Sequence, residues 1–120
     1  MSGTALNMQA TPSLAIDSCD MMIRLLEKQT QGIYHCVGSE HVDRLEYAKA
    51  SARAFNLDPE LVYACPADFA EIDLPAEVGI PADTRLDGSH TQTVIERPLL
   101  SLTEGLSIFK KQLETGELGL

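Results

Sequence analysis

The stretch GIYHCVGSEHVDRLEYA, residues 32–48, constrains the fold more than any other part of this chain. Residues 33–37 form a short, mainly apolar run between glycines, which favours a buried strand. Asp43 and Glu46 then have the spacing of a capping box: the aspartate accepts from the backbone amide three residues on, and the glutamate reaches back. We therefore predict a central strand at 33–37 and a helix at 43–55.

Two further helices follow from apolar residues that recur with a helical period. In residues 12–28, with Thr11 as the expected N-cap, the apolar face consists of Ala15, Cys19, Met22, Ile23 and Leu26. In residues 102–114, the apolar face consists of Leu102, Leu106, Phe109 and Leu113. Ser101 and Glu104 form a second capping box, which predicts where this last helix begins.

The remaining segments are less regular. We expect an edge strand or an arm at residues 1–10, a second short strand at 61–65 and a short helix near 89–96. Residues 66–88 are rich in Pro, Asp and Glu and are predicted to be irregular. Together these elements predict a single α+β domain over residues 1–120, with three or more helices packed on a short sheet.

Composition excludes several classes of function. The net charge is −9, and the nine basic residues are scattered, which argues against a nucleic-acid partner or an anionic membrane surface. Three widely separated cysteines indicate reduced thiols and a cytoplasmic location, and no pair of Cys or His has metal-ligand spacing. The first residues do not form a secretory signal, and no apolar run is long enough to span a membrane.

Four short motifs, taken in order, resemble a known family. They are TPS at residues 11–13, GIYHCVG followed by YAKASARAFNLDP, PADTRLD at residues 81–87, and SLTEGL at residues 101–106. Their order and spacing resemble the C-terminal substrate-binding subdomain of extended short-chain dehydrogenase/reductases, of the dTDP-4-dehydrorhamnose reductase type. The resemblance runs from about residue 11 to residue 113, and it implies an α+β subdomain that holds a nucleotide sugar.

The resemblance does not extend to the catalytic parts of the family. The chain has no G-x-x-G-x-x-G loop, which the family uses to bind the dinucleotide pyrophosphate. The family's catalytic Tyr-x-x-x-Lys is also missing, since Tyr47 and Lys49 have the wrong spacing. We therefore expect no bound cofactor, no catalytic residue and no hydride transfer by this chain alone.

The family's phosphate-binding group is expected in residues 80–87. At the usual arginine position the chain has Ile80, which has no donor, but Arg85 lies nearby. The resemblance thus suggests three candidate substrate-binding residues: Asp83, Thr84 and Arg85. The alternative for Arg85 is a surface salt bridge with Asp83 or Asp87.

Two functions remain open from the sequence. The first is a free-standing relative of the substrate-binding subdomain, which weakly binds a nucleotide sugar or a separate cofactor-binding subunit. The second is a structural or interaction module that self-associates as a symmetric dimer, through the surface that the cofactor half would cover. The apolar residues expected on that surface are Leu74, Val78, Ile80 and Leu86.

Overall fold

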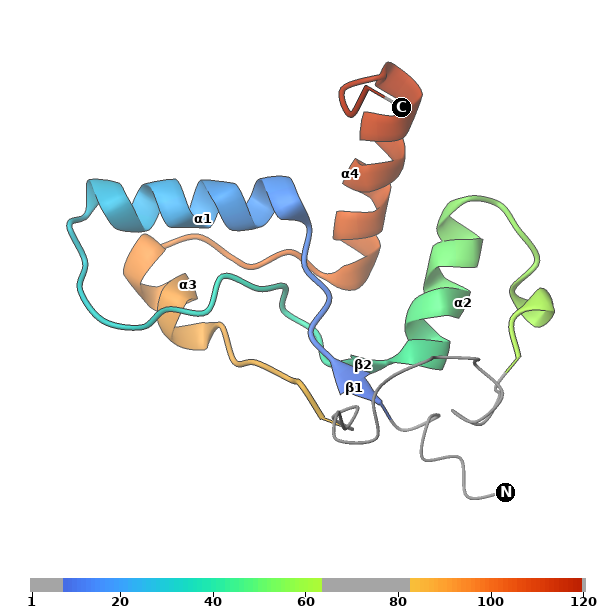
Figure 1. Ribbon diagram of the computed structural model, residues 1–120, viewed down its shortest axis with the longest axis horizontal. Helices are drawn as coiled ribbons and strands as arrows, with labels where there is room; N and C mark the ends of the chain where they lie inside the picture. The colour runs from blue at the N-terminus through green and yellow to red at the C-terminus, as the bar shows by residue number, and fades with distance from the viewer. Residues whose placement is uncertain (1–7, 64–82, 120) are drawn as a thin grey trace, which may run out of the picture.

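The computed structural model describes residues 8–63 and 83–119, and it is an α+β structure (Figure 1). Its helices are α1 (Ala15–Glu27), α2 (Arg44–Ala54), α3 (Ser89–Ile95) and α4 (Leu102–Thr115), with a short 3-10 turn η2 (Pro59–Leu61). Two short strands, β1 (Gln9–Ala10) and β2 (Val42–Asp43), complete the described elements. The predicted fold class is confirmed, and the four predicted helices lie within a few residues of their expected bounds. None of the helices in the described ranges is long and apolar enough to span a membrane.

The sheet joins three distant parts of the chain. β1 and β2 pair antiparallel, with Gln9 opposite Asp43 and Ala10 opposite Val42. On the other edge of β1, the Thr84 amide donates to the Gln9 carbonyl at 3.0 Å. The sheet thus holds the residues before α1, the start of α2 and the approach to α3 in one place.

The helices pack in two pairs: α1 lies against α3, and α2 lies against α4 (Figure 1). Met21, Leu25 and Ile95 are the buried centre of the first pair, and Met21 is 0% exposed. The partly buried side chains packed around this centre are Tyr34, Cys36, Val94 and Leu99. In the second pair Ala52 and Leu106 are buried, and the rings of Phe55 and Phe109 meet edge to face at 6.1 Å.

The helix starts read from the sequence are largely confirmed. The Asp43 carboxylate accepts from the Glu46 amide at 2.7 Å, but no hydrogen bond returns from the Glu46 side chain, so only half of the first predicted capping box is present. At α4, Ser101 and Glu104 form the reciprocal box that was predicted. α1 differs, because its N-cap is Leu14 rather than Thr11 and no side chain caps it. The prediction for Thr11 was wrong because its hydroxyl is bound elsewhere, to the backbone at Leu86.

The predicted strand at residues 33–37 was wrong, because no strand pairs with this extended segment in the described chain. Two of its carbonyls accept from hydroxyls on the neighbouring helices: Ser18 donates to Cys36 and Thr91 donates to His35, each at 2.8 Å. These side-chain bonds replace the ladder that a strand would need. The predicted strand at 61–65 is also absent from its described part, since Leu61 ends η2 and residues 62–63 form no ladder.

The buried face of α1 is the opposite of the predicted one. Met21, Leu25 and Asp17 face the interior, whereas Ile23 and Leu26 are 55% and 77% exposed. The reason is that Asp17 forms an ion pair with Arg97 across the interface and Ser18 hydrogen-bonds the Cys36 carbonyl. Together with Met21 and Leu25 these contacts orient the helix, so its more apolar face points outward.

Residues 66–88, predicted to be irregular, are described only from residue 83. Residues 83–88 contain neither helix nor strand, and Asp83 makes a single bridge to Gln9. Leu74, Val78 and Ile80 lie outside the described residues. Leu86, the fourth residue of the predicted dimer surface, is 41% exposed.

Candidate functional site

The three substrate-binding residues expected from the resemblance lie together at the edge of the sheet. The Arg85 guanidinium donates two hydrogen bonds to the Asp83 carboxylate, of 2.9 Å from Nε and 2.7 Å from Nη2. Thr84 is bound to the sheet through its amide and its hydroxyl, which both donate to the Gln9 carbonyl. The Arg85 side chain therefore has the surface salt bridge that was the alternative reading of this residue.

In this pair the positive charge of Arg85 and the negative charge of Asp83 offset each other. Hydrogen bonds from Arg85 lower the pKa of Asp83 to about 2, and the same contact raises the pKa of Arg85. Both side chains are about half exposed, so water screens the attraction. A diphosphate would have to compete with the Asp83 carboxylate for the same fork of donors.

Replacing Arg85 with Ala is expected to raise the pKa of Asp83 from about 2 toward its ordinary value of 3.8. The lowered pKa also means that the pair stabilises the fold above about pH 4, and that this contribution is lost as the pH falls toward 2. An NMR titration of the Asp83 carboxyl carbon measures the shift, with Arg24→Ala as the control. An unchanged Asp83 titration in Arg85→Ala would contradict the pairing.

A second set of hydrogen bonds ties the same loop to the start of α1. The Thr11 hydroxyl accepts from the Leu86 amide at 2.9 Å and lies 2.9 Å from His41 Nδ1. Beyond this point, Asp87 accepts from the Ser89 amide at 2.8 Å, and this bond lowers the pKa of Asp87. The polar groups around the expected site are thus engaged in holding the chain together.

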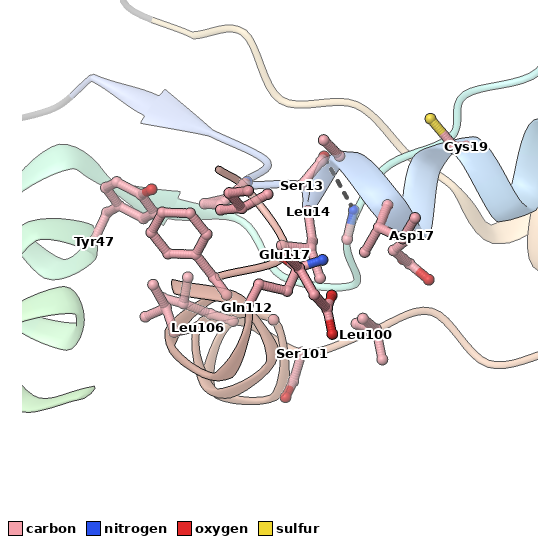
Figure 2. A pocket seen from close by; sticks show the side chains of 18 residues that line it. Ser13, Leu14, Asp17, Cys19, Tyr47, Leu100, Ser101, Leu106, Gln112 and Glu117 are labelled. Carbon is pink, nitrogen blue, oxygen red and sulfur yellow. Dashed lines mark hydrogen bonds between the residues drawn. The ribbon is translucent and has the colours of Figure 1, made fainter. Parts of the chain in front are cut away.

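The structure has a cavity of about 600 Å³ between the first turns of α1 and one face of α4 (Figure 2). Its lining is Pro12, Ser13, Leu14, Ala15, Ile16, Asp17, Cys19, Gly38, Tyr47, Leu100, Ser101, Leu102, Gly105, Leu106, Phe109, Gln112, Glu117 and Leu118. None of the three expected substrate-binding residues is among them. The cavity lies where the two helix pairs meet, so each pair contributes one wall.

Three backbone segments cross beside this cavity and position its walls. The Gly38 amide donates to the Ser13 hydroxyl at 3.3 Å, the dashed bond in Figure 2, and the Ser39 amide donates to the Leu100 carbonyl at 2.9 Å. The Glu40 carboxylate accepts from the Leu102 amide at 2.6 Å and so holds the start of α4 against this crossing. The TPS, GIYHCVG and SLTEGL motifs therefore meet in space.

Sequence reasoning missed this cavity, although one signal for it exists. Gly105 lies in the middle of α4, where a side chain would otherwise be expected. A Cβ atom built there would meet only the Leu14 Cβ, at 4.0 Å. The missing side chain leaves room between α4 and the start of α1.

The outward face of α1 is the third feature of the described surface. Ile16, Met22, Ile23 and Leu26 are each about half exposed or more, and Cys19 is exposed on the same helix. The other cysteine in the described residues, Cys36, is partly buried, and burial raises the pKa of its thiol. Within residues 8–63 and 83–119, no group of three or more His, Cys, Asp or Glu residues is arranged to hold a metal ion.

Comparison with known proteins finds no relative for this arrangement: no family model, no curated protein and no solved structure matches the chain.

Proposed function

We propose that this chain is a non-catalytic interaction module, related to the substrate-binding subdomain of dTDP-4-dehydrorhamnose reductase-like proteins, which pairs with a second copy of itself through α1. The observation that carries the proposal is the apolar face of α1, which the fold turns away from its own core. Exposed apolar patches of several hundred Å² commonly mark sites of protein association.

The spacing along this face favours another helix as its partner. Ile16, Cys19, Ile23 and Leu26 follow one another by three, four and three residues, which is the a/d spacing of a coiled-coil seam. Met22 widens the same face. A helix with this spacing packs best against a partner helix that offers the same ridge of side chains.

The face is also self-complementary about a two-fold axis. In an antiparallel pair centred at Met21, Ile16 of one copy lies opposite Leu26 of the other, and Cys19 lies opposite Ile23. Each of the four seam positions then meets an apolar position, as a symmetric interface requires, whereas Met22 at the edge of the seam lies opposite Asp20. A specific interface buries at least about 1,000 Å² in total, so residues that flank the seam on α1 would have to take part in the contact as well.

Nucleotide-sugar binding is the second candidate, and the order of the resembling motifs is what supports it. The described surfaces favour it less. A diphosphate needs cationic donors, whereas the Arg85 guanidinium is engaged by Asp83 and the cavity lining contains no Lys or Arg. We therefore place association above nucleotide-sugar binding. The reductase reaction itself is not part of the proposal, because the chain lacks the family's Gly-rich loop and Tyr-x-x-x-Lys.

Replacing Ile23 with Glu is expected to weaken self-association at least 100-fold, because a charge on the seam would meet apolar side chains of the second copy. Light scattering and sedimentation at micromolar concentration measure it. The matched control is Leu57→Glu, which places the same charge on an exposed leucine beyond the end of α2. The control variant should associate as the original chain does.

The salt dependence of self-association is a second test of pairing through α1. Two copies that each carry a net charge of −9 repel, so added salt should tighten a pair held by apolar contacts. A mass near 13.1 kDa at all concentrations, or equal association of the Ile23→Glu variant, would contradict pairing through α1.

A further inference from the structure

We propose that the cavity between α1 and α4 is a binding site for an uncharged, mainly apolar small molecule that carries an aromatic ring and a hydrogen-bond acceptor. The site is formed within one chain, although Ile16 and Cys19 of its lining also belong to the α1 seam proposed for pairing. The volume of about 600 Å³ lies within the range of roughly 300–1,000 Å³ found for small-molecule sites.

The lining determines which ligands fit. Most of it is aliphatic, contributed by Leu14, Leu100, Leu102, Leu106 and Leu118, with the rings of Tyr47 and Phe109 on the side nearest α2. Figure 2 shows Tyr47 and Leu106 on the same side of the space, with Ser13 and Leu14 of the α1 entrance beside them. Aromatic walls favour a flat ring in the ligand, because rings pack against one another in offset or edge-to-face contacts.

Charge excludes the anions that the family resemblance would suggest. The lining contains two carboxylates, Asp17 and Glu117, and no Lys, Arg or His. Asp17 is in the first turn of α1, where it already occupies the positive end of the helix, and its own partner is Arg97. A phosphate or carboxylate placed here would find no cationic side chain in the lining and would be repelled by Glu117, while the charge of Asp17 is offset by Arg97.

The polar groups that remain are suited to orienting a neutral ligand. α1 begins at Ala15 without a capping side chain, so its first-turn amides have no intrahelical partner, and Ala15, Ile16 and Asp17 of that turn belong to the lining. Gln112 contributes an amide from the α4 side. A carbonyl or ether oxygen of the ligand can accept from such donors without bringing a charge into the apolar space.

A pair of fluorescent probes that differ by one charge tests the proposal. N-phenyl-1-naphthylamine is uncharged, and 8-anilino-1-naphthalenesulfonate is its sulfonated counterpart. We expect the uncharged probe to bind saturably with one molecule per chain, and the sulfonated probe to bind at least tenfold more weakly. Fluorescence titration at fixed ionic strength measures both affinities.

Gly105→Leu should fill the cavity from α4 and weaken binding of the uncharged probe at least tenfold. The matched control is Thr103→Leu, which adds the same side chain to an exposed position of α4 outside the lining and should change the affinity less than twofold. Ala15→Leu narrows the cavity from the α1 wall and should weaken the probe even if Gly105→Leu folds poorly, which circular dichroism would reveal. Folded Gly105→Leu and Ala15→Leu variants that keep full affinity would overturn the proposal.

The outcomes for this site and for the pairing of two copies are separable. The Ile23→Glu variant should keep the uncharged probe at full affinity, since Ile23 is not in the lining. If that variant loses the probe, the probe reports the exposed face of α1 and the cavity proposal fails. If the chain is a monomer and yet binds the probe in the Gly105-dependent manner, the cavity proposal holds and the pairing fails. The cavity proposal would also be overturned if the uncharged probe showed no saturable binding, or if the two probes bound equally well.

Discussion

Replacing Arg97 with Ala is expected to lower the free energy of unfolding by about 3–5 kcal/mol, the loss typical of a buried ion pair that loses one partner. The Arg97 Nη2 atom lies 2.7 Å from Asp17 Oδ1, and Asp17 is only 8% exposed. Arg97 also donates to the Pro98 carbonyl at 3.0 Å. Its Nε lies 3.2 Å from Asp20 but has no partner in hydrogen-bond geometry, so Asp17 is the main contact of the guanidinium. The substitution would leave the Asp17 carboxylate buried beside α3 without its cation.

Chemical denaturation measures this loss of stability, and two further variants serve as comparisons. Arg24→Ala removes the exposed pair with Asp20, and it should lower the stability far less than Arg97→Ala because water screens an exposed pair. Replacing both Asp17 and Arg97 with apolar residues should recover part of the loss, because no charge is then left buried alone. A cost below about 1 kcal/mol for Arg97→Ala would show that this pair does not orient α1.

The second large effect is expected at Gly38, where Ala should cost about 3 kcal/mol, the upper end of the usual cost of overpacking. A Cβ atom at this position would lie 2.4 Å from the Pro12 carbonyl oxygen and 3.3 Å from the Leu100 carbonyl oxygen. Both are backbone atoms, so no side chain can rotate to relieve the contact. The crossing of three segments would have to open, and the cavity walls would move with it.

Gly105→Ala is the matched comparison, because it adds the same methyl group to a glycine with free space around it. Its Cβ would meet nothing closer than 4.0 Å, and Ala is favoured over Gly inside a helix. This variant should therefore gain about 0.5–1 kcal/mol of stability. Thermal unfolding of the two variants side by side gives both values. Equal stabilities would contradict the close backbone crossing at Gly38.

The helix caps predicted from the sequence are mostly present in the structure. Asp43, Ser101 and Glu104 cap the helices they were expected to cap, because a cap depends on residues only two or three positions apart. The direction in which α1 faces did not follow from its apolar pattern, because it depends on Arg97, eighty residues away. Likewise residues 33–37 have the composition of a strand, but Ser18 and Thr91 supply the hydrogen bonds that a neighbouring strand would have supplied.

The candidate sites show the same difference between features made by neighbouring residues and features made by residues far apart in the sequence. That Arg85 pairs with Asp83 could be expected from two residues of separation, and the structure has this pair. The cavity could not be derived in this way, since its walls come from segments that the sequence separates widely. Only the glycine within α4 indicated that space would be left there, and its meaning depends on where α1 passes.

The pairing of α1 with α3 and of α2 with α4 has a consequence for how the chain folds during synthesis. The pairs are interleaved along the chain, so neither is complete in any N-terminal fragment that ends before α3. While the ribosome makes the first half, Met21 of α1 and Ala52 of α2 both lack the surfaces that bury them. Contacts between such distant segments slow folding, because the chain loses entropy on closing the long loops before the packing contacts can stabilise it. The nascent chain should therefore remain sensitive to proteases until α3 has emerged, and α2 should gain protection last, when α4 arrives.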